Sequence, residues 1–182
     1  MQPTLFFPHG PASVNYGALG TTIGHEIMHG YDIRGFHIDD NGRWRSWGNN
    51  ETSRRYEENT LCIRKSHEEV DYQRRQVNDE LDSENLADFV GLVAAYAAFE
   101  ALPENQRNVR PVGAAGVGTS PDQAFFVSYC ANSCERDDHK FRGYATGRGR
   151  CLVPAINHPA FARAFNCSSG DRMHPAKKCS FF

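Results

Sequence analysis

The stretch Gly-His-Glu-Ile-Met-His-Gly at residues 24–30 decides how this chain folds. Side chains four residues apart lie one above the other on a helix, so His25 and His29 can direct both imidazoles toward one Zn²⁺ ion. Glu26 falls beside such an ion, where its carboxylate can take a proton from bound water. A chain of this composition would contain only about 0.02 matches to His-Glu-x-x-His by chance. The stretch therefore predicts a helix with two metal ligands and a general base.

A second stretch, Glu-Asn-Leu-Ala-Asp beginning at Glu84, can supply the missing ligand. A catalytic zinc keeps three protein ligands and one open position. The apolar pattern of 84–102 stops before Pro103, which predicts a helix with Glu84 and Asp88 on one face of its first turn. We expect Glu84 to bind the metal and Asp88 to accept the spare N–H of a ligating imidazole. Asp32 is a second candidate for that supporting role. The alternative for Glu84 and Asp88 is a charged first turn that the helix dipole favours.

Most of the remaining sequence also predicts helices, so we expect a mainly α chain with one core. The charged segment 52–76 alternates basic pairs with glutamates, which is typical of a solvated helix face. Ser-Pro-Asp-Gln at 120–123 has the form of a capping box with proline at the first helical position. The expected helices are 16–31, 52–76, 84–102, 120–133 and 157–165, with loops at 35–48 and 105–119.

Charge and composition weigh against several other classes of protein. The chain has 182 residues and a formal net charge of −2, which gives no electrostatic case for binding nucleic acid or a membrane surface. Its longest apolar run, 89–99, fits a buried core helix better than a membrane span. Six cysteines indicate an oxidising compartment, and the absence of a Cys-x-x-Cys pair makes them weak candidates for zinc ligands.

Taken together, these stretches resemble the C-terminal part of the zinc metallopeptidases of the neprilysin and endothelin-converting-enzyme family. The resemblance implies a mainly α, thermolysin-like zinc-helix core of the gluzincin type. It implies one zinc ion bound by His25, His29 and Glu84. It also implies Glu26 as the general base and Asp88 as the aspartate that orients a ligating histidine. The similar pieces occur in the family's order and with comparable spacing: Leu5-Phe6-Phe7, Val14 to Gly20, Ile23 to Gly30, Glu84 to Asp88, Phe125-Phe126, Ala164 to Cys167 and Lys177-Lys178-Cys179.

The resemblance covers nearly all of this chain but only roughly the last quarter of a full-length family member. It implies that residues 1–182 are the C-terminal catalytic domain of a longer protein and lack most of the N-terminal lobe. That missing lobe is one expected partner, and peptide substrates are the other. The implied activity is that of a metalloendopeptidase acting on short peptides. The implied location is an extracellular or cell-surface ectodomain.

One segment departs from the family pattern. Family members carry a histidine that steadies the oxyanion of the tetrahedral intermediate. Counting back from the similar piece Ala164 to Cys167 places Tyr144 at that position. Arg150 is kept, and in the family this arginine grips a substrate backbone carbonyl. A phenol can donate a hydrogen bond to an oxyanion, so Tyr144 could replace the imidazole in part; His139 is the other candidate, at the wrong spacing. For the segment itself, the alternative is an Arg/Gly-rich surface loop without chemistry. For the chain, the alternatives are a catalytically impaired, peptide-binding pseudo-peptidase or a truncated fragment.

The cysteines follow the same comparison. The resemblance implies a Cys62–Cys179 disulfide that ties the region after the zinc helix to the C-terminal tail. Two others match family positions whose partners lie upstream of this chain, Cys134 and Cys167. A bridge between the remaining two, Cys130 and Cys151, would hold the altered Tyr144 segment in place.

Overall fold

The computed structural model describes residues 5–45, 48–71, 79–111, 118–134 and 143–181. Within these ranges the regular structure is helical, apart from an isolated antiparallel bridge between Ile38 and Trp44. The expected mainly α fold is confirmed. None of the helices in the described ranges has both the length and the apolar character that a bilayer crossing requires.

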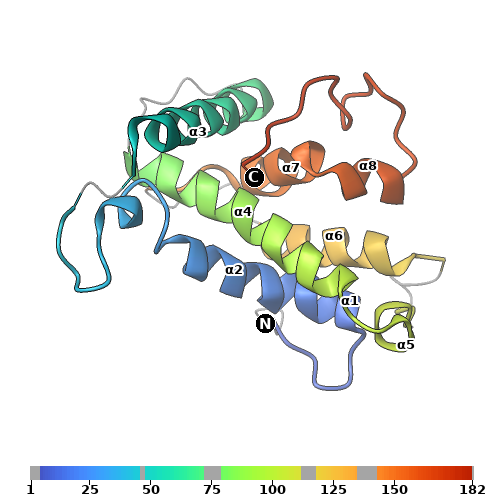
Figure 1. Cartoon of the computed structure of the whole chain (residues 1–182). Helices are drawn as coiled ribbons and strands as arrows, with labels where there is room; N and C mark the ends of the chain where they lie inside the picture. Colours follow the sequence, from blue (N-terminus) through green and yellow to red (C-terminus); the bar gives the residue numbers. More distant parts are fainter. Residues whose placement is uncertain (1–4, 46–47, 72–78, 112–117, 135–142, 182) are drawn as a thin grey trace.

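Figure 1 shows α4 running through the middle of the molecule, with α2 along one side and α3 and α7 along the other. The elements are α1 (Ala12–Asn15), the π-helix η1 (Tyr16–Gly20), α2 (Thr21–Met28), the 3-10 helix η2 (Gly35–His37), α3 (Asn50–Asp71), α4 (Asp79–Glu100), α5 (Glu104–Arg107), α6 (Pro121–Ala131), α7 (Gly147–Asn157) and α8 (Pro159–Ala164).

The helix that carries the two histidines differs from the expected range of 16–31. It begins earlier, because α1, η1 and α2 follow one another without a break from Ala12 to Met28. It also ends earlier, at Met28, so His29 is its C-cap residue, with the backbone still in the helical region. The π-helical turn rearranges the backbone hydrogen bonds, and side chains satisfy carbonyls there. The hydroxyl of Thr21 donates to the carbonyl of Gly17 at 2.8 Å, and the amide of Asn132 donates to the carbonyl of Ala18 at 3.2 Å.

The core is built around α4, whose apolar residues between Leu86 and Phe99 are mostly covered by neighbouring helices. Its buried side chains belong to two clusters, one toward each end of the helix. The first contains Leu86, Phe89, Met28, Ile63 and Val153, and the second contains Leu92, Tyr96, Phe99, Phe125 and Phe126.

Two glycines allow α2 and α4 to cross in backbone contact. A Cβ added at Gly24 would lie 2.8 Å from the carbonyl oxygen of Gly91. A Cβ added at Gly91 would lie 2.6 Å from the backbone nitrogen of His25. Both distances are shorter than real Cβ contacts, so only residues without a side chain fit at this crossing. The close approach sets the first half of α4 beside His25 and His29.

Helix α7 was not predicted. Residues 144–150 were expected to form either a substrate-binding segment or an Arg/Gly-rich surface loop. The side chain of Thr146 accepts a hydrogen bond from the N–H of Gly149 at 3.0 Å and so caps the start of the helix. A Cys130–Cys151 disulfide joins α7 to α6. The Cys62–Cys179 disulfide implied by the resemblance is also present, and it joins α3 to the C-terminal segment. Two cysteines are free thiols, Cys134 and Cys167.

Helix α4 begins at Asp79, five residues before its expected start at Glu84, so Glu84 lies beyond its first turn. Helices α3, α6 and α8 lie close to their expected positions. The capping box at Ser120 and Gln123 is present at the start of α6. His158 caps α8, because its Nδ1 accepts a hydrogen bond from the N–H of Ala160 at 3.2 Å. Burial lowers the pKa of His158 to about 4, and the positive charges of Arg163 and Lys178 act in the same direction. Short helix α5 falls inside the segment that was expected to be a loop.

Candidate metal centre

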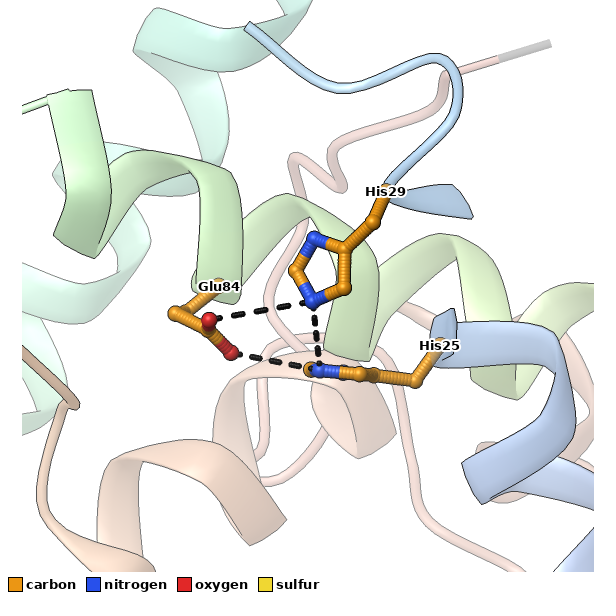
Figure 2. A group of neighbouring side chains, drawn as sticks. All are labelled: His25, His29 and Glu84. Carbon is orange, nitrogen blue, oxygen red and sulfur yellow. Dashed lines mark hydrogen bonds and ion pairs between the residues drawn. The ribbon is translucent and has the colours of Figure 1, made fainter. Parts of the chain in front are cut away.

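Three side chains converge on one point between α2 and α4, as Figure 2 shows: His25 in α2, His29 at the C-cap of α2, and Glu84 in α4. The Nε2 atoms of His25 and His29 lie 3.1 Å apart. The Oε2 atom of Glu84 lies 3.2 Å from Nε2 of His25, and its Oε1 lies 3.7 Å from Nε2 of His29. One ligand atom from each residue therefore falls within 4.8 Å of the others. The side chains of His25 and Glu84 are only 12% and 14% exposed, whereas that of His29 is 31% exposed.

The hydrogen bonds around these residues fit a divalent cation. Nδ1 of His25 lies 2.8 Å from Oδ1 of Asp88, and Nδ1 of His29 lies 2.7 Å from Oδ2 of Asp32. An ionised carboxylate can only accept, so each pair places the imidazole proton on Nδ1 and leaves the Nε2 lone pair facing inward. Oε2 of Glu84 is buried and accepts no hydrogen bond from the described residues. Two nitrogen lone pairs and a carboxylate would repel one another without a cation among them, and this donor set suits zinc.

The electrostatics of His25 agree with this arrangement. Burial of the imidazole lowers its pKa, but its close contacts with the carboxylates of Asp88 and Glu84 and their negative charges outweigh that effect and raise the pKa to about 9. The surroundings thus favour one positive charge at this point. Either a proton or a metal cation can supply that charge.

Asp32 is held firmly in its place beside His29. Its Oδ1 accepts hydrogen bonds from the backbone N–H groups of Arg34 and Gly35, each at 2.8 Å, and its Oδ2 accepts a bond from the hydroxyl of Ser83. Burial alone would raise the pKa of Asp32, but these hydrogen bonds, with Gly35 contributing most, bring it below its ordinary value. The carboxylate therefore stays ionised and can orient the imidazole of His29.

Asp88 connects the metal centre to α7. The carboxylate accepts hydrogen bonds from Nε of Arg150 at 2.7 Å and from Nη2 at 2.8 Å, in addition to its contact with His25. Burial acts to raise the pKa of Asp88, but the hydrogen bond from Arg150 and then that from His25 bring it below its ordinary value. The guanidinium also lies over the ring of Tyr144, with 4.7 Å between its central carbon and the ring centroid. The guanidinium has five N–H groups, and Asp88 accepts hydrogen bonds from only its Nε and Nη2 atoms. Arg150 therefore keeps further N–H donors for other partners.

A cavity of about 420 Å³ opens beside the histidines. Glu26 is exposed on this side of α2 and makes no hydrogen bond or ion pair with any residue that the structure describes. The negative charge of Glu84 is the largest cause that raises the pKa of Tyr144, so the phenol keeps its proton near neutral pH. The cavity therefore combines an available carboxylate with a hydroxyl donor. Its lining includes His25, Glu26, Asp88, Tyr144, Arg150 and Leu5.

The structure brings the predicted site residues together in this region, with Asp88 beside one imidazole and Asp32 beside the other. His139 lies outside the described residues. Sequence reasoning missed two hydroxyls that support the centre: that of Ser83, which bonds to Asp32, and that of Tyr129, which donates to the carbonyl of Arg150 at 2.5 Å. The sequence indicated Ser83 only as a candidate capping residue before Glu84, a role excluded by the start of α4 at Asp79, and it gave no signal for Tyr129.

The sequence of this chain matches one family of peptidases and several of its members. The sequence model of peptidase family M13 matches residues 1–181. The chain is 35% identical to neprilysin-2 of Caenorhabditis elegans and 34% identical to an endothelin-converting enzyme homolog of Locusta migratoria. These alignments cover 98% and 93% of this chain but 25% and 24% of the two relatives. The chain therefore spans about a quarter of the length of the curated relatives that it matches.

Solved structures give the same result for the fold. The crystal structure of PepO from Lactobacillus rhamnosis superposes with a TM-score of 0.73 at 26% identity, and the match covers 96% of this chain and 27% of that one. The zinc metalloprotease Zmp1 of Mycobacterium tuberculosis superposes with a TM-score of 0.78 over 98% of this chain and 29% of that one. At 24% identity, the second comparison supports the fold alone.

Proposed function

This chain belongs to peptidase family M13, and from that premise we propose that it is the zinc-binding catalytic part of a metalloendopeptidase. Residues 1–182 would form the C-terminal catalytic domain of a longer protein. The observation that carries the proposal is the meeting of the two inward-facing Nε2 atoms with the Glu84 carboxylate, each imidazole being held by its own aspartate. His25, His29 and Glu84 would hold one zinc ion.

The reaction we propose is hydrolysis of a peptide bond, with peptides as substrates. Bound zinc would supply Lewis-acid chemistry, polarising the scissile carbonyl and making water acidic enough to ionise near neutral pH. Glu26 would take a proton from the attacking water as the new carbon–oxygen bond forms. It would then deliver that proton to the leaving amine as the carbon–nitrogen bond breaks. Its exposed carboxylate in the cavity beside His25 supports this role.

Two further residues in the lining of the cavity would act on the substrate. Tyr144 would donate its hydroxyl proton in a hydrogen bond to the oxyanion of the tetrahedral intermediate. Arg150 would hold a substrate backbone carbonyl with the N–H groups that Asp88 does not use. The contact between Arg150 and the Tyr144 ring supports a joint role, because it keeps both groups at the same wall of the cavity.

A second candidate function is peptide binding with little turnover. It is favoured by Tyr144, a residue that the family resemblance places where other members carry a histidine. Losing one oxyanion donor costs about 10²- to 10³-fold in turnover, so an imperfect donor at this position would leave the metal centre intact and the rate low.

We further propose that the parent protein is exposed to an extracellular or cell-surface environment and that its N-terminal lobe is the principal partner of this chain. Two disulfides, Cys62–Cys179 and Cys130–Cys151, support an oxidising compartment.

The test combines metal content with hydrolysis. The chain is dialysed against zinc, and the number of zinc ions bound per chain is measured by mass spectrometry. Cleavage of a quenched fluorescent peptide is then followed for the wild type and for Glu26→Gln. Glu104→Gln, which alters an exposed glutamate on α5, is the matched control. One zinc per chain, with hydrolysis lost only in Glu26→Gln, is the expected result. Zinc binding without hydrolysis in the wild type would favour the peptide-binding candidate, and less than stoichiometric zinc would refute both.

A further inference from the structure

A second cavity, of about 470 Å³, lies between α3, α7 and the C-terminal segment. The described residues that line it are all different from those that line the cavity at the metal centre. Helix α7 contributes to both cavities, since Arg148 lines the second one and Arg150 the first. Residues two apart on a helix point about 200° away from each other, so α7 separates the two cavities. We call this second cavity the basic groove.

The rim of the basic groove carries a concentration of positive charge. Lys65 comes from α3, Arg148 from the first turn of α7, and Arg172 and Lys177 from the C-terminal segment; all four are exposed. Among the described residues of the lining, Glu69 is the one acidic residue, so their four positive charges and one negative charge give a local net charge of +3. The whole chain has a net charge of −2, so this positive charge is local.

These cations are available for a ligand. Within the part of the chain that the structure describes, none of the four makes an ion pair or a side-chain hydrogen bond. Four like charges around one opening repel one another, and an anion in the groove would relieve that repulsion. The first turn of α7 adds the partial positive charge of a helix N-terminus beside Arg148.

The floor of the basic groove is apolar. Leu152 and Ile156 follow Arg148 at four-residue intervals and so lie on the same face of α7. Val70 of α3 and Met173 of the C-terminal segment complete the floor, and Ile156 is only 8% exposed. A ligand that fills the groove would therefore cover apolar side chains while its charged group stays at the rim.

The walls of the groove are fixed to one another. The Cys62–Cys179 disulfide joins α3 to the C-terminal segment. The buried side chain of Asn157 donates to the hydroxyl of Ser66 at 3.0 Å and accepts from the N–H of Cys179 at 2.7 Å. One amide thus holds all three walls together. A ligand would meet a preformed site, which reduces the ordering cost of binding.

From this combination we propose that the basic groove binds an organic oxyanion, specifically a phosphate or sulfate monoester that carries an apolar group. The four cations at the rim would contact the oxyanion, and the apolar floor would receive the hydrocarbon part. Arginine favours this chemistry because its planar fork matches the geometry of phosphate and sulfate oxygens. The site is independent of the metal centre and of the peptidase function.

The test is calorimetric titration of the 182-residue chain with three probes: octyl phosphate below its micelle concentration, inorganic phosphate, and octyl glucoside. Octyl phosphate carries the anion and the apolar chain, whereas the other two probes each carry one of these features. We expect one octyl phosphate per chain. Inorganic phosphate and octyl glucoside should each bind at least tenfold more weakly.

Paired variants test whether binding is at the groove. Arg172→Gln with Lys177→Gln removes two exposed charges from the rim, and we expect the affinity for octyl phosphate to fall about tenfold. Arg43→Gln with Arg110→Gln removes two exposed charges elsewhere and should leave the affinity unchanged. No binding of octyl phosphate, equal affinity for octyl glucoside, or equal losses in the two paired variants would each overturn the proposal.

Discussion

Replacing Asp88 by asparagine should separate the two tasks of this carboxylate. Oδ1 accepts from His25 and from Nη2 of Arg150, and Oδ2 accepts from Nε of Arg150. An asparagine has one acceptor oxygen and one NH₂ group. If its oxygen keeps the contact with His25, its NH₂ group faces an N–H of Arg150, and two donors then oppose each other. The substitution therefore retains a hydrogen bond to the imidazole but loses the charge and part of the ion pair.

The expected magnitudes follow from burial. The side chains of Asp88 and Arg150 are 7% and 26% exposed, so the pair is largely shielded from water. Removing one partner of a buried ion pair costs about 3–5 kcal/mol, and we expect about 3 kcal/mol here because asparagine keeps one acceptor. An imidazole that bonds to a neutral amide is a weaker base than one that bonds to a carboxylate. Zinc affinity should therefore fall by about 10- to 100-fold.

The assay measures two quantities on the same protein. The free energy of unfolding comes from urea titration with a chelator present, because bound metal would itself stabilise the fold. Zinc affinity comes from competition with a chromophoric chelator. The matched control is Asp82→Asn, since Asp82 is buried on α4 and accepts hydrogen bonds from Arg64, one of them from Nε at 3.1 Å. Asp82 precedes Glu84 by two residues and so points away from the metal centre.

Both variants should lower the free energy of unfolding by similar amounts, but only Asp88→Asn should weaken zinc binding. An equal loss of zinc affinity in Asp82→Asn would show that the effect comes from a destabilised α4. The hydrogen bond to His25 would then not be its cause, and the reasoning would be refuted.

Three further predictions concern the crossing, the cavity and a buried histidine. Gly91→Ala should destabilise the fold by at least about 1–3 kcal/mol and weaken zinc binding, because its methyl group would lie 2.6 Å from the backbone nitrogen of His25. The control is Gly20→Ala, whose methyl group would have its nearest contact at 3.5 Å. It should change neither the free energy of unfolding nor zinc affinity in the same urea and zinc assays. Tyr144→Phe should lower peptide turnover about 10²-fold at unchanged zinc content, and an unchanged rate would remove Tyr144 from the chemistry. The pKa of His158 is lowered to about 4, so between pH 4 and 6.5 the unfolded chain holds a proton that the folded chain has released. The free energy of unfolding should therefore rise with pH through this window, by about 3 kcal/mol from this residue. His158→Asn, which keeps a capping side chain, should remove that part of the slope in urea titrations from pH 4 to 7, and an unaltered slope would contradict the assignment.

The metal centre was accessible to sequence reasoning because its rules are local. His25 and His29 share a helix face by their spacing alone, and Glu84 and Asp88 share another. What periodicity does not give is how the two faces meet. That meeting depends on Gly24 and Gly91, whose missing side chains let the backbones of α2 and α4 touch. A glycine in a helix pattern signals lower propensity, and only the structure shows that it marks a crossing.

Helix α7 was missed because its composition argues against a helix. Gly147 and Gly149 each cost about 1 kcal/mol in a helix interior, and a proline costs about 3 kcal/mol. Long-range features override this local preference. Val153 and Ala155 are completely buried, and the Cys130–Cys151 disulfide fixes the helix to α6. None of these features can be read from an eleven-residue window.

The proline in α7 leaves one backbone carbonyl without its helical hydrogen bond, and a side chain of α6 supplies a replacement donor. Pro154 has no N–H to donate to the carbonyl four residues earlier, which belongs to Arg150. The hydroxyl of Tyr129 on α6 donates to that same carbonyl at 2.5 Å. The backbone of Arg150 is thus satisfied from outside its own helix, and the neighbouring Cys151 is fixed to the same helix α6 by its disulfide. The side chain of Arg150 donates a hydrogen bond to Asp88, and Asp88 in turn accepts one from His25. Consecutive hydrogen bonds therefore connect the contact between α6 and α7 to the metal centre.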